Sequence, residues 1–221
     1  IHSPRATYDI QFGNLERPAH WNTSWDWARF EVCGHKWADL SEGDYGVSLL
    51  SDSKYGWDIK GNVMRLTLLK GAIYPDAEAD LGKHRFVYSL YPHEGDWRTA
   101  ETVQRAYELN IPVRVAKVTG RGHLPQSMSL ASVDDYNLII ESIKKAEDDD
   151  SLIIRLFETY GQRGTAAINF PQAVQFAVEV NLLEVETEET KAQSVNISGQ
   201  SMAFAYTPYE IKTFRLRLTA Q

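Results

Sequence analysis

Residues 20–56 read HWNTSWDWARFEVCGHKWADLSEGDYGVSLLSDSKYG, and the fold of the chain is organised around this stretch. It contains four of the six tryptophans of the chain, and Trp57 follows it directly. Histidines and carboxylates stand between the indole rings. Aromatic rings bury a large area while keeping a polar tip, so this composition is typical of a hydrophobic core or of a sugar-facing surface. A core is the more frequent use of such residues.

Outward from this stretch, apolar and polar residues alternate with the period of two that is typical of β-strands. In the first half of the chain this pattern predicts strands at residues 7–12, 46–51, 63–69, 85–91 and 112–118. Residues 96–110 (DWRTAETVQRAYELN) have helical spacing instead, and Pro112 lies just beyond their end. The sequence therefore predicts a sheet protein with one helix.

The second half of the chain continues as short alternating strands. Residues 136–145 (YNLIIESIKK) and 151–161 (SLIIRLFETYG) flank an acidic turn and predict a hairpin. Further strands are predicted at residues 174–180, 201–206 and 214–218, the last of them at a sheet edge that Arg215 and Arg217 protect. Several short strands with polar outer faces are typical of a β-sandwich.

These patterns predict an all-β chain of two units. Residues 1–118 form part of a large β-sandwich with one helix, and residues 133–221 form a smaller C-terminal β-sandwich. Between them, residues 119–132 (TGRGHLPQSMSLAS) combine Gly, Pro and Ser without periodicity, which predicts a linker or long loop.

Composition excludes several classes of function. The net charge of −7 argues against non-specific binding to nucleic acid, and no apolar run is long enough to span a membrane. Cys33 is the only cysteine, so an internal disulfide is excluded, and we expect a buried, unreactive thiol. The N-terminus lacks a signal pattern, which leaves either a cytoplasmic protein or a chain whose start has been removed; we expect a cytoplasmic one.

No motif of catalysis or metal binding is complete. The six histidines are scattered, without HExxH or other zinc-ligand spacing, so no metal site is predicted. Asp39, Glu42 and Asp44 offer carboxylates for the paired geometry of a retaining glycosidase, but turns use the same residues for hydrogen bonding. The acidic runs 147–150 and 184–189 are expected to be solvated.

Long, ordered segments of the chain carry a family resemblance. Residues 17–71 (RPAHWNTSWDWARFEVCGHKWADLSEGDYGVSLLSDSKYGWDIKGNVMRLTLLKG) and 75–97 (PDAEADLGKHRFVYSLYPHEGDW) resemble the C-terminal β region of glycoside hydrolase family 38 α-mannosidases, as do residues 137–161. The resemblance is strongest to the bacterial, fungal-vacuolar and cytosolic group and implies a supersandwich-like fold for the first unit.

The resemblance also implies what is missing. Such enzymes use an Asp nucleophile and a zinc ion that binds mannose, both held by an N-terminal barrel and a helical bundle. Nothing in this chain matches those motifs, so we expect no catalytic residue and no cofactor in it. The start at Ile1, without Met, fits the tail of a larger mannosidase. Its expected partners are the catalytic barrel of the same parent chain and mannose-containing glycans.

In the family the β region packs against the barrel and lends loops to the rim of the sugar site. The resemblance places Lys54, Tyr55 and Trp57 nearest the substrate, in a Gly-bounded loop between two strands. Residues of the same stretch are candidates for the interdomain contact: Trp25, Trp27, His35, Asp39 and Asp44. An apolar surface around Trp25, Trp27 and Trp57 also predicts self-association, and hence a homo-oligomer, when the barrel is absent.

Two other functions remain open from the sequence. A free-standing carbohydrate-binding module would present exposed aromatic rings on a flat sheet face. A sugar epimerase of the mutarotase type would use a His and a Glu in the cleft of a large β-sandwich, and His84, His93 and Glu94 are the candidates. A mannose titration and a mutarotation assay, respectively, separate these functions from that of a mannosidase tail.

Overall fold

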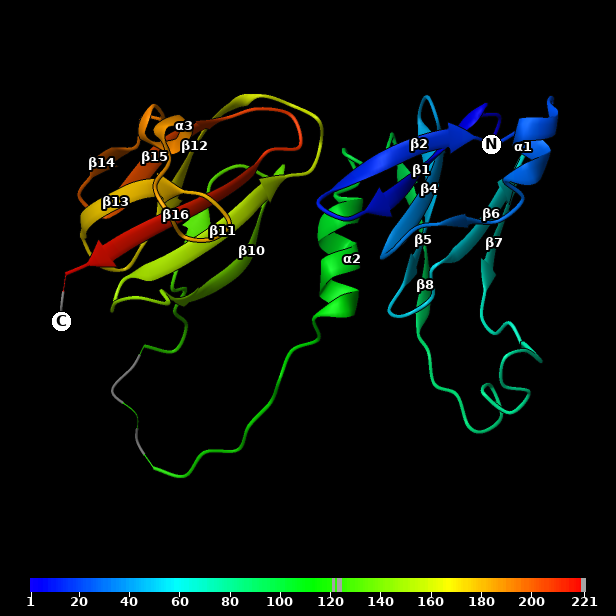
Figure 1. Ribbon diagram of the computed structural model, residues 1–221, viewed down its shortest axis with the longest axis horizontal. Coiled ribbons are helices and arrows are strands. Elements are labelled where there is room, and N and C mark those ends of the chain that lie inside the picture. The colour runs from blue at the N-terminus through cyan, green and yellow to red at the C-terminus, as the bar shows by residue number, and fades with distance from the viewer. Residues whose placement is uncertain (121, 123–124, 220–221) are drawn as a thin grey trace. The chain divides into compact units, whose positions relative to one another are not determined.

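The computed structural model describes residues 1–120, 122 and 125–219, and these form two compact units, Ile1–Val115 and Ala116–Gln221 (Figure 1). Arg121 and His123, which belong to the predicted loop 119–132, lie outside the described residues. Strands dominate both units, which confirms the all-β prediction. None of the helices in the described residues has the length and apolar character that a membrane-spanning segment needs.

The first unit contains two antiparallel sheets. The larger has the strand order β2-β1-β4-β5-β8, and the smaller has the order β3-β6-β7. The strands of the larger sheet are β1 (Arg5–Ile10), β2 (Gly13–Pro18), β4 (Trp37–Glu42), β5 (Tyr45–Ser51) and β8 (Tyr88–Glu94). Those of the smaller are β3 (Val32–Cys33), β6 (Gly56–Lys60) and β7 (Val63–Thr67).

The core of the first unit lies between these sheets. Tyr8 and Leu40 of the larger sheet pack in one cluster with Trp57 and Ile59 of β6. Trp57 and Ile59 are two residues apart, so they lie on the same face of their strand. Their full burial shows that the tryptophan-rich stretch does supply a core. Two sheets whose inner faces bury large rings in this way form a sandwich.

The β4–β5 hairpin requires glycine at position 46. Gly46 lies opposite His93 of β8. A Cβ atom at position 46 would overlap the imidazole ring of His93 and the hydroxyl group of Ser41. A glycine inside a strand commonly marks such a close approach of another group. The hairpin and β8 can therefore pack side by side only because this residue has no side chain.

The predicted helix is shorter than expected. Helix α2 (Thr102–Asn110) begins six residues after Asp96, because Asp96 caps a separate turn by accepting hydrogen bonds from Arg98 and Thr99. Glu101 then has a left-handed backbone, with φ of 53°, which separates the turn from the helix. The buried face of α2, including Val103 and Ala106, packs on the larger sheet.

Two short helices escaped prediction. Helix α1 (Ser24–Ala28) begins at a capping box in which Thr23 and Asp26 bond each other's backbone N–H groups. Helix α3 (Glu188–Lys191), in the second unit, begins at an equivalent box between Thr187 and Thr190. Each helix is too short to give a hydrophobic period, so its capping residues are the only sequence signal.

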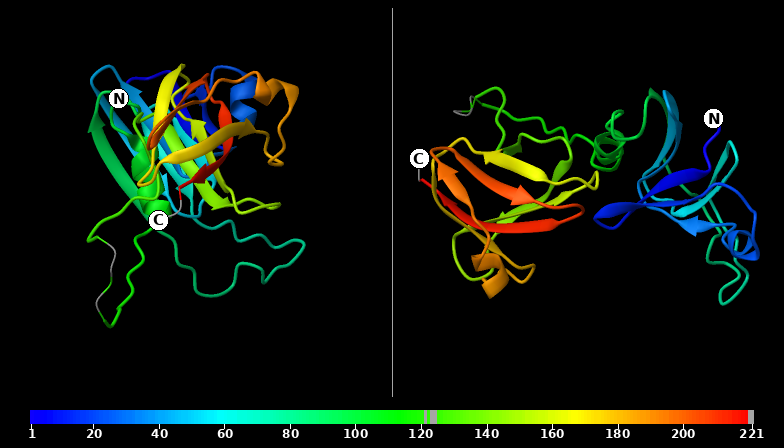
Figure 2. Two further views of the ribbon diagram at one scale, coloured as in Figure 1. Left: turned by 90° about the vertical axis from the view of Figure 1, so that its left-hand side faces the viewer. Right: turned by 90° about the horizontal axis from the view of Figure 1, so that it is seen from above.

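The second unit is a sandwich of two four-stranded antiparallel sheets, ordered β10-β11-β16-β13 and β14-β15-β12-β9. The predicted hairpin is confirmed as β10 paired with β11. Ile154 and Phe214 from one sheet meet Ile168 and Phe204 from the other in a fully buried core. Figure 2 shows the strands of this unit arranged in two layers. The strands are β9 (Ser132–Val133), β10 (Leu138–Lys145), β11 (Leu152–Glu158), β12 (Gly164–Asn169), β13 (Val174–Val180), β14 (Asn196–Ser198), β15 (Ser201–Tyr206) and β16 (Ile211–Leu218).

Two strand predictions were wrong. Residues 214–218 belong to β16, which lies in the middle of its sheet between β11 and β13 and not at an edge. Arg215 and Arg217 pair with Asp148 and Asp149 of the acidic turn. The predicted strand at residues 112–118 forms no ladder with any described residue.

Candidate functional site

Aromatic side chains are exposed where α1 passes into β3. Trp25 and Trp27 of α1 are 74% and 66% exposed, and Phe30 in the following turn is 61% exposed. The ring of Trp27 makes an edge-on contact with that of Trp21, with centroids 5.6 Å apart. Helix α1 buries none of its own residues, so its indole rings do not serve the core of the unit. Exposed apolar groups in such a cluster mark an interaction site.

A groove of about 390 Å³ continues from Phe30 toward β6 and β7. Phe30 and Tyr55 supply its aromatic rings, Glu31 its only carboxylate and Lys70 its ammonium group. We call it the aromatic groove, and its lining residues are Phe30, Glu31, Val32, Cys33, Tyr55, Gly56, Thr67 and Lys70. Rings beside one acid and one base suit a partner that is part apolar and part polar, such as a sugar or a neighbouring domain.

The glycine in the aromatic groove gives room to its acid. A Cβ atom on Gly56 would overlap the carboxylate of Glu31, which lies across the start of β6. Cys33 pairs with Gly56 in the β3–β6 ladder, and its thiol is exposed in the groove. The expectation of a buried thiol was therefore wrong, because β3 lies at an edge of its sheet.

The three predicted rim residues have different environments. Tyr55 is 55% exposed, and its ring meets the edge of His35 at a centroid distance of 5.4 Å. The ammonium group of Lys54 lies 5.0 Å from the centre of the Phe86 ring. Trp57 is 0% exposed and packs beneath Gly34 in the core, on the opposite face of β6 from Gly56. Tyr55 is thus the one member of the set that lines the aromatic groove.

The predicted interdomain residues do not form one patch. Trp25 and Trp27 are exposed on α1, and His35 is partly buried where its backbone N–H donates to the carbonyl oxygen of Asp9. Asp44 lies in the β4–β5 turn, where its carbonyl oxygen accepts a hydrogen bond from the backbone N–H of Gly95. Of these residues, His35 contacts the aromatic groove, through the ring of Tyr55.

Asp39 is the centre of a buried polar network. Its Oδ2 atom accepts a hydrogen bond from Ser48 Oγ at 2.7 Å and lies 2.8 Å from Nε2 of His93. Ser48 Oγ also lies 2.8 Å from Oγ1 of Thr102, which starts α2. All four residues are buried, so the network links three strands and a helix inside the first unit.

The residues considered for acid–base chemistry have separate partners. Asp39 is bonded inside the network, and Glu42 accepts a hydrogen bond from the backbone N–H of His2. His93 is buried beside Asp39, whereas His84 is exposed and bonds the carbonyl oxygen of Asp80. Asp39, Glu42 and His84 are therefore each held by a different partner. Within the described residues, no group of three or more potential ligands could hold a metal ion.

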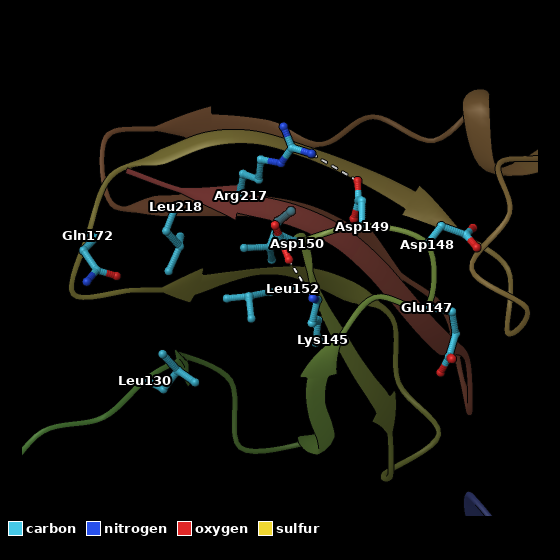
Figure 3. Close-up of a pocket in the computed structure, with 11 residues that line it drawn as sticks. Leu130, Lys145, Glu147, Asp148, Asp149, Asp150, Leu152, Gln172, Arg217 and Leu218 are labelled. Carbon is cyan, nitrogen blue, oxygen red and sulfur yellow. Dashed lines mark hydrogen bonds and ion pairs between the residues drawn. The ribbon is translucent and has the colours of Figure 1, made fainter. Parts of the chain in front are cut away.

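A larger cavity, of about 820 Å³, lies in the second unit beside the acidic turn 147–150 (Figure 3). All four of its carboxylates are ion-paired. Lys145 pairs with Asp150 at 2.6 Å and Arg217 with Asp149 at 3.1 Å. Lys144 pairs with Glu147, and Arg215 with Asp148. Leucines, among them Leu152 and Leu218, form its apolar side. The charges offset one another across this surface.

The expectation that the acidic runs are solvated was wrong at one position. Glu184 is buried, and its carboxylate pairs with Lys144 at 2.7 Å and accepts a hydrogen bond from the backbone N–H of Glu147. Because these partners stabilise the ionised form, the pKa of Glu184 is lowered. This residue therefore anchors the acidic turn to the second sandwich.

Sequence reasoning missed Phe30, Glu31 and Lys70 of the aromatic groove. The order β3-β6-β7 brings them together although Lys70 is forty residues along the chain from Phe30. No local motif marks such an assembly. The one available signal in the sequence was Gly56, at the end of the loop that contains Lys54 and Tyr55. A glycine at such a position indicates that another side chain comes close to the backbone there.

Both units match families of known proteins. Residues 1–78 match the family described as "Glycosyl hydrolases family 38 C-terminal domain". Residues 137–214 match the "Glycosyl hydrolases family 38 C-terminal beta sandwich domain". The two matched segments are in the same order as the two units and fall within them.

Relatives extend the match over nearly the whole chain. Alpha-mannosidase G of Dictyostelium discoideum is 40% identical over 97% of this chain, and Alpha-mannosidase 2C1 of Mus musculus is 38% identical over 99%. A crystal structure of an alpha-mannosidase from Enterococcus faecalis V583 superposes on 98% of the chain with a TM-score of 0.78 and 17% identity, which shows a shared fold. The chain spans about a fifth of the length of the curated relatives and 24% of that crystallised chain.

Proposed function

Because this chain belongs to the C-terminal region of glycosyl hydrolase family 38, we propose that it is the non-catalytic β region of a larger, retaining α-mannosidase that releases terminal α-linked mannose. Relatives named as α-mannosidases support the proposal, since the chain aligns with them almost end to end while spanning a fifth of their length. The remaining four-fifths have room for the catalytic part.

The observation that carries the proposal is the exposed aromatic surface of the first unit. Trp25, Trp27 and Phe30 place three large rings in solvent within six residues of one another, and Phe30 lines the aromatic groove. Burying a ring of this size contributes about 1.5–3 kcal/mol, so leaving three exposed is a substantial unused contribution to stability. The catalytic part of the parent chain is the partner that would cover them, and the β region would thereby brace it.

The chemistry of the aromatic groove is consistent with a supporting role. A retaining glycosidase uses two carboxyl groups about 5–5.5 Å apart, and Glu31 is the one carboxylate among the residues that line this groove. The zinc ion that the family resemblance implies does not fit the described residues, which offer no cluster of ligands for it. We propose that zinc and the catalytic carboxylates are held by the rest of the parent chain.

A role at the rim of the sugar site follows for the loop before β6. Tyr55 is exposed and beside His35, so its hydroxyl and ring are available to a sugar held by the catalytic part. Lys54 belongs to the same loop, which Ser51 fixes by accepting a hydrogen bond from the Lys54 backbone N–H at 2.9 Å. Trp57 supports this loop from below, in the core.

Two measurements test the proposal. The chain alone should show no turnover of an aryl α-mannoside with or without added zinc, whereas the full-length parent should be active. In the parent, the paired change Trp25→Ser and Trp27→Ser should lower thermal stability, while the same change in the isolated chain should have little effect because both rings are exposed.

Leu183→Ser is the matched control, because Leu183 is 81% exposed in the second unit and lies outside the aromatic surface. Zinc-dependent turnover by the chain alone would refute the non-catalytic role. An unchanged melting temperature of the parent carrying both serine substitutions would refute the bracing role. A mannose-dependent change in tryptophan fluorescence of the isolated chain would favour a carbohydrate-binding module instead.

A further inference from the structure

Residues 111–118 (IPVRVAKV) have the sequence of a strand but no partner strand. Val113, Val115 and Val118 are 90%, 92% and 83% exposed, and Ile111 is 68% exposed. Figure 1 shows the chain leaving the end of α2 as an extended trace through these residues. No backbone hydrogen bond joins Pro112–Val118 to a described residue outside the segment.

Such a segment is unusual in a folded protein. Three valines at near-full exposure, and a largely exposed isoleucine, forgo the burial that these residues normally have. Their stiff side chains favour an extended backbone, and that backbone presents a row of N–H and C=O groups. A row of this kind is a template for pairing with the edge of another sheet.

The segment is also uniformly basic. Arg114 and Lys117 lie within it, and no Asp or Glu occurs between Glu108 and Asp134. In an extended chain, Val113, Val115 and Lys117 lie on one face, and Arg114, Ala116 and Val118 lie on the other, so each face carries valine and one cation. An edge that pairs with this segment would therefore be complementary if it offered an apolar face and carboxylates on its flanks.

We propose that residues 113–118 form an edge strand that pairs with an open sheet edge in the part of the parent chain outside these 221 residues. This inference rests on the proposed function, because it requires a longer parent. The relatives are about five times longer than this chain, so they contain ample chain to supply that edge. The adjoining end of α2 is fixed, since Asn110 donates a hydrogen bond to the carbonyl oxygen of Ser51 at 3.1 Å. The strand would thus leave from an anchored point.

Hydrogen exchange of the full-length parent, read by mass spectrometry on peptides covering residues 111–118, tests the proposal. Amides 113–118 should exchange at least about tenfold more slowly in the parent than in the isolated chain. Val115→Pro should lower the melting temperature of the parent and abolish the protection, because proline removes a ladder donor. In the isolated chain it should leave the melting temperature unchanged.

Val115→Thr is the control, because threonine keeps both the N–H group and the β-branched shape. Fast exchange of these amides in the parent would overturn the proposal. Equal protection in the isolated chain would also overturn it, by showing pairing within this chain, or with a second copy if the protection rises with concentration. This result can be told apart from a failure of the proposed function. If the parent is active on α-mannosides but its amides 113–118 exchange fast, the proposed strand is refuted and the proposed function is not.

Discussion

The Nε2 atom of His93 lies 2.8 Å from Oδ2 of Asp39, and the two side chains are only 3% and 2% exposed. They belong to β8 and β4, which do not neighbour each other in the sheet because β5 lies between them. The Oγ atom of Ser48 on β5 contacts both. The pair therefore connects strands across an intervening strand by side chains alone.

Removing His93 should destabilise the first unit. His93→Ala takes away one partner of a buried carboxylate, and a loss on the order of 3 kcal/mol in the free energy of unfolding is expected. Urea unfolding followed by tryptophan fluorescence measures it, because all six tryptophans lie within the first unit. His84→Ala is the control, since that ring is exposed. A loss no larger than that of the control would contradict a structural role for the network.

Lys212 should be the most sensitive cation of the second unit. Its ammonium group is buried and lies 3.0 Å from carboxylate oxygens of both Glu179 and Glu210. Lys212→Ala leaves those acids without their shared partner, and a cost of about 3–5 kcal/mol is expected from urea unfolding followed by circular dichroism. Lys191→Ala breaks only an exposed pair with Glu188 and should cost less than about 1 kcal/mol. Similar losses for the two variants would disprove the distinction.

Two tyrosines should lose their phenolic proton at a higher pH than an ordinary tyrosine. Burial raises the pKa of Tyr8 to about 12, and burial together with the hydrogen bond to Asp135 raises the pKa of Tyr206 to about 12. Absorbance at the phenolate band should therefore show a separate step near pH 12, reduced in Tyr8→Phe and in Tyr206→Phe. Because folding favours the neutral phenols, their contribution to stability is present below about pH 10 and is lost as pH rises toward 12. Full titration near pH 10 in the folded protein would contradict this.

Glu184 should make the second unit acid-sensitive. The Lys144 ion pair and the Glu147 N–H lower its pKa, so its contribution is present above the unfolded pKa of about 4.3 and is lost as pH falls through the lower folded value. Glu184→Gln should lower the melting temperature at pH 7, and the difference from the unmodified chain should shrink as the pH falls below about 4.3. Glu186→Gln changes a neighbouring, exposed acid, and it should alter neither the melting temperature at pH 7 nor its dependence on pH. A difference that is constant across pH would show that ionisation is not involved.

Local patterns predicted most strands of this protein. The hairpin β10–β11 and the strands β13 and β15 could be read directly, because apolar and polar residues alternate in β13 and β15 and an acidic turn separates β10 from β11. Strand order could not be read in the same way. Residues 214–218 looked like an edge because the chain ends nearby, but pairing between distant segments places β16 in the centre.

The site was less predictable than the fold. Trp25, Trp27 and Trp57 stand in similar sequence surroundings. Trp57 shares the inner face of β6 with Ile59 and is buried, whereas α1 exposes the other two. Tyr55 was identified because its loop is bounded by glycine. Phe30, Glu31 and Lys70 were not, since only the packing of separate strands brings them into one groove. Local periodicity carries no information of that kind.

The exposed sulfur of Cys33 limits what oxidation can do to the isolated chain. One accessible thiol per molecule, with no second cysteine to react with, permits a single intermolecular disulfide. Air oxidation can therefore yield covalent dimers in which a disulfide joins Cys33 of one molecule to Cys33 of another, but no higher covalent polymer. Any larger assembly seen in solution must be held by noncovalent forces, and a reducing agent distinguishes the two at once.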